Sequence, residues 1–198
     1  LPQDLPEGYW DRLSTGLRTM GHAAILGMPL GNSQHGFTNS AIGFMPATAQ
    51  LQRYDKHHLV PFGEFIPPFF RWFTNLMHIP LGDFNRGSLG QASFAMRGQR
   101  LAVHICYEDL FGEELATRFL DPATAPTALV NVSNLAWFGE GLAIHQHLSI
   151  ARMRAMEFGL PMLRATNTGA TAIIAHTGVV QAQLPYGSAG VLQGQVQG

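Results

Sequence analysis

The stretch that decides the fold is Leu101-Ala102-Val103-His104-Ile105-Cys106-Tyr107-Glu108-Asp109. Its opening residues are mostly apolar, as in a buried β-strand, and two acids close it. The only cysteine of the 198 residues therefore stands where the expected strand runs out into a turn. Catalytic side chains of α/β proteins tend to lie at that end of the strands. A lone cysteine cannot form an internal disulfide, so Cys106 is either a core residue or a nucleophile.

A second segment, Tyr54-Asp55-Lys56-His57-His58-Leu59-Val60-Pro61-Phe62-Gly63-Glu64, places a lysine among acids. Pro61 and Gly63 predict an ordered turn there. Lys56 beside a reactive thiol would stabilise the thiolate and donate to the oxyanion formed on attack at a carbonyl. Glu64 would hold that lysine charged and oriented. The alternative is a surface lysine beside a loop acid.

A third segment is Leu129-Val130-Asn131-Val132-Ser133-Asn134-Leu135-Ala136-Trp137-Phe138-Gly139, a buried strand that runs into a polar and then aromatic loop. Together the three segments resemble the carbon–nitrogen hydrolase (nitrilase) superfamily, and more closely its membrane branch, the bacterial apolipoprotein N-acyltransferases. The later stretches over 146–157 and 163–169 are similar to the same branch. The likeness runs in order from about residue 54 to residue 178.

The resemblance implies an α/β fold, the four-layer αββα nitrilase-like sandwich, and a Glu–Lys–Cys triad. By motif, Cys106 matches the nucleophile that forms an acyl thioester, and Lys56 matches the lysine that stabilises the oxyanion. Glu64 matches a supporting glutamate after the lysine. The residues expected to support the site or bind substrate are Glu108, Tyr107, Asn134 and Trp137.

The first glutamate of the triad has no clear match. Glu7 is the tempting candidate, but no strand-like run precedes it, and it stands where the first turn of a helix over 9–20 would begin. We therefore expect that the chain, a single domain over 1–198, begins after that glutamate and is incomplete at both ends. Such a fragment would be inactive in acyl transfer and would lack the family's membrane helices.

Composition limits the other possibilities. A net charge of −1 without a basic cluster gives no reason to expect nucleic acid. No stretch of about 18 apolar residues is present, so nothing is expected to span a bilayer. The histidines at 57–58 and 145–147 lack the spacing of zinc ligands on one helix face. We expect neither a metal nor a cofactor.

Periodicity predicts helices over 9–20, 112–119 and 142–158, and strands over 22–28, 40–45, 49–53, 101–106, 127–133, 161–165, 171–176 and 179–184. His147 is expected to pack or hydrogen-bond at its helix face. Between 65 and 73 the chain holds six large apolar side chains. In a lipid-handling enzyme these would line an acyl-chain entrance or enter the membrane interface.

The function that the resemblance implies is transfer of a fatty acyl chain from a phospholipid to the N-terminal amine of a lipoprotein's diacylglyceryl-cysteine. The place would be the periplasmic side of the bacterial inner membrane. A soluble amidase or nitrilase-type hydrolase, in which water takes the acyl group, is the first alternative. A non-catalytic relative that serves as a binding scaffold is the second.

Overall fold

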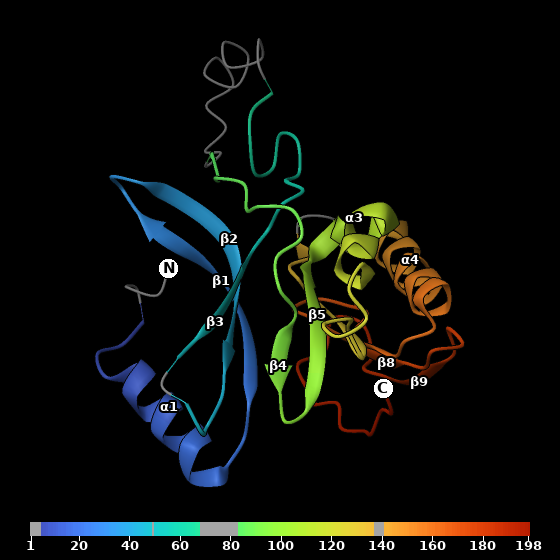
Figure 1. Cartoon of the computed structure of the whole chain (residues 1–198). Helices are drawn as coiled ribbons and strands as arrows, with labels where there is room; N and C mark the ends of the chain where they lie inside the picture. Colours follow the sequence, from blue (N-terminus) through green and yellow to red (C-terminus); the bar gives the residue numbers. More distant parts are fainter. Residues whose placement is uncertain (1–4, 49, 68–82, 137–140) are drawn as a thin grey trace.

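The computed structural model describes residues 5–48, 50–67, 83–136 and 141–198. Two β-sheets lie against each other, with helices on their outer faces (Figure 1). The first sheet has the strand order β1-β2-β3 and the second the order β4-β5-β6-β7-β8-β9.

The first sheet is antiparallel throughout and is preceded by α1 (Tyr9–Met20), the helix that the sequence predicts. Its strands are β1 (Ala24–Asn32), β2 (Gly36–Phe44) and β3 (Gln52–Asp55). The strand predicted over 22–28 extends further, through Pro29. Proline is tolerated there because β1 is an edge strand, paired only with β2 among the described strands.

The second sheet consists of β4 (Phe94–Met96), β5 (Gln99–Ile105), β6 (Ala128–Ser133), β7 (Met162–Thr166), β8 (Ala172–Ile174) and β9 (Val180–Gln183). Strands β5, β6 and β7 are parallel, and the flanking pairs are antiparallel. The helical segments that follow β5 and β6 are η2 (Cys106–Leu110), α3 (Gly112–Ala116), η3 (Thr117–Phe119) and α4 (Leu142–Phe158).

Strand β4 is absent from the sequence-based prediction. It forms a hairpin with β5 through Arg97 and Gly98, whose φ angles are 51° and 83°. Two consecutive positive φ angles match the right-handed twist of paired strands, and Gly98 adopts its angle without a Cβ penalty. The short strand was missed because three residues give too little alternation to detect.

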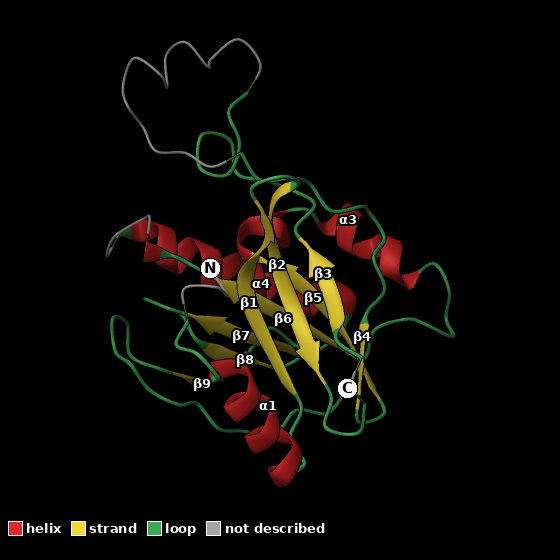
Figure 2. Ribbon diagram, turned by 90° about the vertical axis from the view of Figure 1, so that its left-hand side faces the viewer, coloured by secondary structure: helices red, strands yellow, loops and turns green. Residues whose placement is uncertain are grey.

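The layers follow the expected order. Helix α1 lies on the outer side of the three-stranded sheet, near one end of it, and α3 and α4 lie on the outer side of the six-stranded sheet (Figures 1 and 2). The predicted four-layer αββα sandwich is therefore confirmed. Among the described helices, none combines the length and apolar character needed to cross a membrane.

Both faces of the central strands are buried, and successive residues serve different cores. Ala102 and Leu129 belong to the cluster under α4, whereas Val103 and Val130 belong to the cluster between the sheets. Side chains alternate across a strand, so strands covered on both faces must be apolar at consecutive positions. This explains the nearly continuous apolar runs of β5 and β6.

Candidate active site

Cys106 directly follows β5 and is the first residue of η2, not the last residue of the strand as predicted. Its φ angle is 56°, a left-handed conformation that is uncommon for a residue other than glycine. The amide of Asn131, on the neighbouring strand β6, donates a 2.8 Å hydrogen bond to the Cys106 carbonyl. The side chain is 8% exposed. A strained backbone held by its neighbours at a reactive side chain is typical of functional sites.

Lys56 follows β3 directly and is fully buried, which excludes the surface alternative. Its Nζ donates to Oε1 of Glu64 at 2.9 Å and lies 2.8 Å from Oε2 of the same carboxylate. The same carboxylate accepts from Asn39 Nδ2 at 2.7 Å and from the Val60 N–H at 2.8 Å. Glu64 is thus occupied on both oxygens, and it fixes the position of the ammonium group.

Glu108 ties the cysteine turn to the lysine turn. Its buried carboxylate accepts from the Tyr54 hydroxyl at 2.9 Å and from the Ile105 N–H at 2.7 Å. It also accepts from the N–H groups of His57 at 2.8 Å and His58 at 3.1 Å. Burial raises the pKa of Glu108, and these hydrogen bonds act in the opposite direction. Because every partner is a donor, the carboxylate form satisfies this arrangement best.

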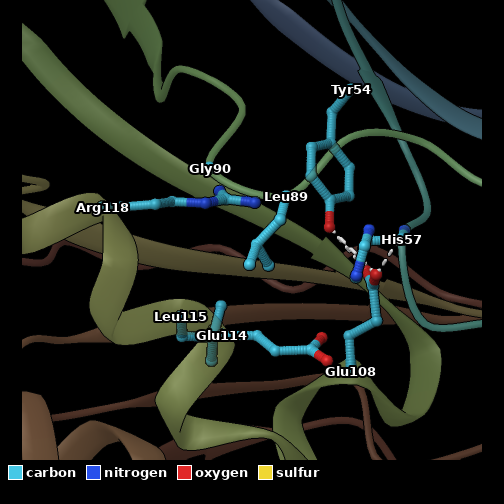
Figure 3. Close-up of a pocket in the computed structure, with 8 residues that line it drawn as sticks. All are labelled: Tyr54, His57, Leu89, Gly90, Glu108, Glu114, Leu115 and Arg118. Atoms are coloured by element: carbon cyan, nitrogen blue, oxygen red, sulfur yellow. Dashed lines mark hydrogen bonds between the residues drawn. The ribbon is translucent and has the colours of Figure 1, made fainter.

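Figure 3 shows this carboxylate pointing toward Tyr54 and His57 at the wall of a small cavity. The cavity, of about 20 Å³, is lined by Tyr54, His57, Leu89, Gly90, Glu108, Glu114, Leu115 and Arg118. That volume suits roughly one water molecule. Cys106 is not among the lining residues, so this cavity is separate from the thiol.

Tyr107 covers the buried lysine. Its ring centre lies 5.1 Å from Lys56 Nζ, within the range of a cation–π interaction. Its hydroxyl donates to the Leu59 carbonyl at 2.7 Å. Burial, followed by the nearby Glu64, raises the pKa of Tyr107 to about 12, so the hydroxyl remains a neutral donor.

The thiol itself lies in an electropositive environment. Burial alone would raise the pKa of Cys106, but interactions with His147, Lys56 and Ser133 outweigh it, and the net shift is downward. A lowered thiol pKa increases the fraction present as thiolate, the form that attacks carbonyl groups. The positive charge of Lys56 is one of the causes of this downward shift.

The two remaining predicted site residues, Asn134 and Trp137, come from the loop after β6. Asn134 follows β6, as expected, but it is exposed. Its Oδ1 accepts from Asn167 Nδ2 at 2.7 Å and from the Ala136 N–H at 3.1 Å, which orders the loop. Trp137 lies outside the described residues, and so does most of the apolar stretch over 65–73.

Several polar residues near Cys106 were not predicted from the sequence as part of the site. They are Asn131, Ser133, Asp109, His147 and Arg164. Asn131 and Ser133 alternate on β6, and this period of two puts both on the face toward Cys106. This alternation could have predicted from the sequence that both side chains lie on the same face of the strand. Asp109 and Arg164 come from η2 and β7, and only the fold joins them in a buried 3.2 Å ion pair.

The fold and this site define the class of protein: a nitrilase-type αββα sandwich with a buried thiol beside a lysine–glutamate pair. The model of the carbon-nitrogen hydrolase family matches residues 5–198, and the chain belongs to this family. The solved carbon-nitrogen hydrolase from Helicobacter pylori G27 shares the fold, with a TM-score of 0.69 at 16% identity over 96% of this chain and 69% of that chain.

Relatives with higher sequence identity have a more specific name. The apolipoprotein N-acyltransferase of Verminephrobacter eiseniae is 62% identical over the whole of this chain and 37% of its own length. The apolipoprotein N-acyltransferase of Ralstonia nicotianae is 52% identical over the whole of this chain and 38% of its own length. The chain thus spans well under half the length of these relatives.

Proposed function

We propose that this chain is the catalytic segment of an apolipoprotein N-acyltransferase of the bacterial inner membrane, acting on the periplasmic side. The observation on which the proposal rests is the cysteine turn. The backbone of Cys106 is left-handed, and the charge of the buried Lys56 helps to lower the pKa of its thiol. The identity of 62% to a relative of that name supports the choice of reaction.

In the first step the Cys106 thiolate attacks the ester carbonyl of a phospholipid. A carbon–sulphur bond forms and the carbon–oxygen bond of the ester breaks. The lysophospholipid leaves as an alcohol, and its proton balances the one that the Cys106 thiol lost on ionising. Lys56 donates to the oxyanion of the tetrahedral intermediate, and Glu64 keeps the lysine in place.

In the second step the N-terminal amine of the diacylglyceryl-cysteine acceptor attacks the thioester. A carbon–nitrogen bond forms, the carbon–sulphur bond breaks, the amine loses a proton and the thiolate is regenerated. Both steps build negative charge at the same carbonyl oxygen, so a single fixed ammonium group serves both.

The other site residues have supporting roles in this proposal. Glu108 holds the turns of Cys106 and Lys56 together, and Tyr107 covers the lysine. Asn134 and Trp137 are assigned to the substrate-facing loop after β6. Glu64 is already saturated with donors, so we do not assign it the role of general base.

The test is a chimera, in which this chain replaces the matching segment of the Verminephrobacter eiseniae relative. With a phospholipid donor and a synthetic diacylated lipopeptide, we expect N-acylated lipopeptide and, without acceptor, an acyl thioester on Cys106 detectable by mass spectrometry. Cys106→Ala should abolish both, and Cys106→Ser nearly so. Release of free fatty acid with no acceptor product would instead favour the hydrolase. Turnover above a few per cent of the parent chimera's rate in the alanine variant would refute Cys106 as nucleophile.

A further inference from the structure

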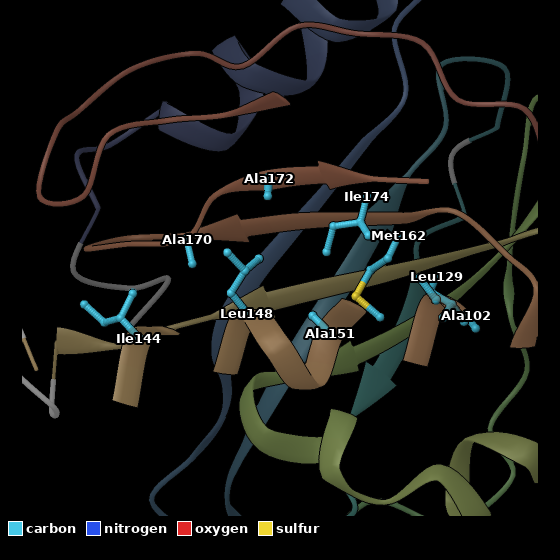
Figure 4. Packing of buried hydrophobic residues seen from close by; sticks show 10 residues of the cluster. Ala102, Leu129, Ile144, Leu148, Ala151, Met162, Ala170, Ala172 and Ile174 are labelled. Atoms are coloured by element: carbon cyan, nitrogen blue, oxygen red, sulfur yellow. The ribbon is translucent and has the colours of Figure 1, made fainter. Parts of the chain in front are cut away.

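His147 lies on α4 with its imidazole buried, 7% exposed. The helix is fixed to the six-stranded sheet by apolar contacts of Ile144, Leu148 and Ala151, which point toward the strands in Figure 4. The position of His147 is therefore set by the core and not by a loop. The sequence suggested only that it packs or hydrogen-bonds at the helix face.

The Nδ1 atom of the imidazole is already engaged. Arg164 Nη2 donates to it at 2.6 Å, and the same guanidinium donates from Nη1 to Asp109 Oδ2 at 3.2 Å. Asp109 Oδ2 also lies 3.3 Å from Nδ1. Since a guanidinium has only donors, the shorter contact requires that Nδ1 accept a hydrogen bond. The neutral ring then has its proton on Nε2.

That Nε2 atom makes no hydrogen bond of ordinary geometry to any residue that the structure describes. A buried donor without a partner is costly and rare in native proteins. The imidazole acts on the Cys106 thiol, whose pKa it lowers. Because Arg164 already engages Nδ1, Nε2 is the ring nitrogen left for that interaction. Ser133 Oγ has no ordinary partner within the described chain either, and it too acts on the Cys106 sulphur.

We infer that His147 donates from Nε2 to the Cys106 sulphur and stabilises the thiolate, as a donor additional to Lys56. An imidazolium would also present a hydrogen on Nε2, but its Nδ1–H would then face the Arg164 donor, so the neutral ring fits the contacts better. Burial lowers the pKa of His147, but interactions with Asp109 and Cys106 outweigh it, and the net shift is upward. In this inference Nε2 of His147 acts as a hydrogen-bond donor to the thiolate and not as a general base.

The thiol and the imidazole share their surroundings with charged or titratable groups from several elements. Those groups are Lys56 and Glu64 around the turn after β3, His104 on β5, Tyr107, Glu108 and Asp109 on η2, and Arg164 on β7. Substitution of His147 keeps all of these residues, but it removes the hydrogen-bond acceptor of Arg164 Nη2. The glutamine variant separates the two effects, because its side chain can still donate toward the thiol.

The inference rests on the nucleophile of the proposed function, but its test does not need acyl transfer. In this chain Cys106 is the only cysteine, so the rate of alkylation by iodoacetamide as a function of pH reports one thiol. His147→Leu should raise the midpoint by about one pH unit, a tenfold loss of thiolate below it. His147→Gln, whose amide nitrogen can donate from near the place of Nε2, should shift the midpoint by less than half as much.

His145→Leu is the matched control, because it makes the same change on the same helix at an exposed position. It should leave the midpoint unchanged. Circular dichroism checks that each variant is folded, and His147→Met replaces the leucine variant if leucine does not fold, since methionine adapts to irregular spaces.

An unchanged midpoint in the folded leucine or methionine variant would overturn the inference. Equal shifts of the alkylation midpoint in the glutamine and apolar variants would overturn it too. Such a result would mean that the ring acts through its charge and not through a hydrogen bond. If the thiol shifts as expected but the chimera forms no N-acyl product, the inference stands and the proposed acyl transfer fails. If the chimera is active but the thiol midpoint does not shift, the acyl transfer stands and the role of His147 fails.

Discussion

The ammonium group of Lys56 lies 2.9 Å from Oε1 and 2.8 Å from Oε2 of Glu64, and the lysine is completely buried. A buried charge is tolerated only where it is paired and hydrogen-bonded, and this one is paired with a carboxylate that two further donors hold. The cost of burying this pair is consistent with a role in chemistry, because a neutral side chain would fill the same space more cheaply.

Lys56→Met should lower kcat of the chimera by at least about 10²-fold, the effect of losing one oxyanion donor. Lys56→Arg should not restore activity, since a planar guanidinium cannot take the place of a compact ammonium group. The measurement is steady-state formation of N-acylated lipopeptide. A fully active methionine variant would place the lysine outside the chemistry.

A control separates this effect from loss of folding. Lys56→Met leaves the Glu64 carboxylate without its counter-charge, which typically costs about 3–5 kcal/mol of unfolding free energy. The double variant Lys56→Met/Glu64→Gln removes both charges and should regain part of that stability while remaining inactive. Recovery of activity together with stability would mean that the lysine is structural.

The left-handed backbone at Cys106 makes a prediction about stability. Glycine usually destabilises a protein relative to alanine, but at a φ of 56° it avoids a strain of roughly 1–2 kcal/mol. Cys106→Gly should therefore unfold in urea at a denaturant concentration no lower than Cys106→Ala does. Glycine usually makes a protein less stable than alanine does, by about 1 kcal/mol. A glycine variant that is less stable than the alanine variant by that much or more would show that the turn relaxes away from this conformation.

The sequence predicts most of the architecture, because strong periodicity and local signals decide it. Helices α1 and α4 have the bounds that their apolar spacing indicates, and β5, β6 and β7 fall within two residues of their predicted ends. Boundaries fail where a local rule is overridden, as at Pro29 inside β1, which only an edge position permits.

The candidate site was predictable only in part, and the reason is physical. Residues close in sequence, such as Lys56 and Glu64, form a pair whose chemistry can be inferred from spacing. Asp109, His147 and Arg164 are far apart in the chain. Only the pairing of β5, β6 and β7, with α4 packed on them, brings the three into contact with one another. Long-range polar networks leave no periodic signal.

The buried pair of Arg164 and Asp109 should behave differently from a surface pair. Both side chains are fully buried at 3.2 Å, so Arg164→Met should cost about 3–5 kcal/mol of unfolding free energy. The double variant Arg164→Met/Asp109→Leu should cost less than the single one. Glu157→Gln, which breaks the pair between the half-exposed Glu157 and Arg154, should cost at most about 1 kcal/mol. Equal losses for the buried and the surface pair, measured by urea unfolding, would contradict the argument.

The last prediction concerns His104, whose ring is fully buried on β5. Burial lowers its pKa to about 4, with Asp109 acting in the opposite direction, against an unfolded value near 6.5. The unfolded chain therefore binds a proton first as pH falls, so stability is lost between about pH 6.5 and pH 4. Roughly two and a half units correspond to about 3 kcal/mol. The measurement is unfolding free energy against pH for the wild type and for His104→Gln, which lacks this titration. The variant should lose less stability across that window, whereas parallel curves would mean that His104 is protonated in the folded protein.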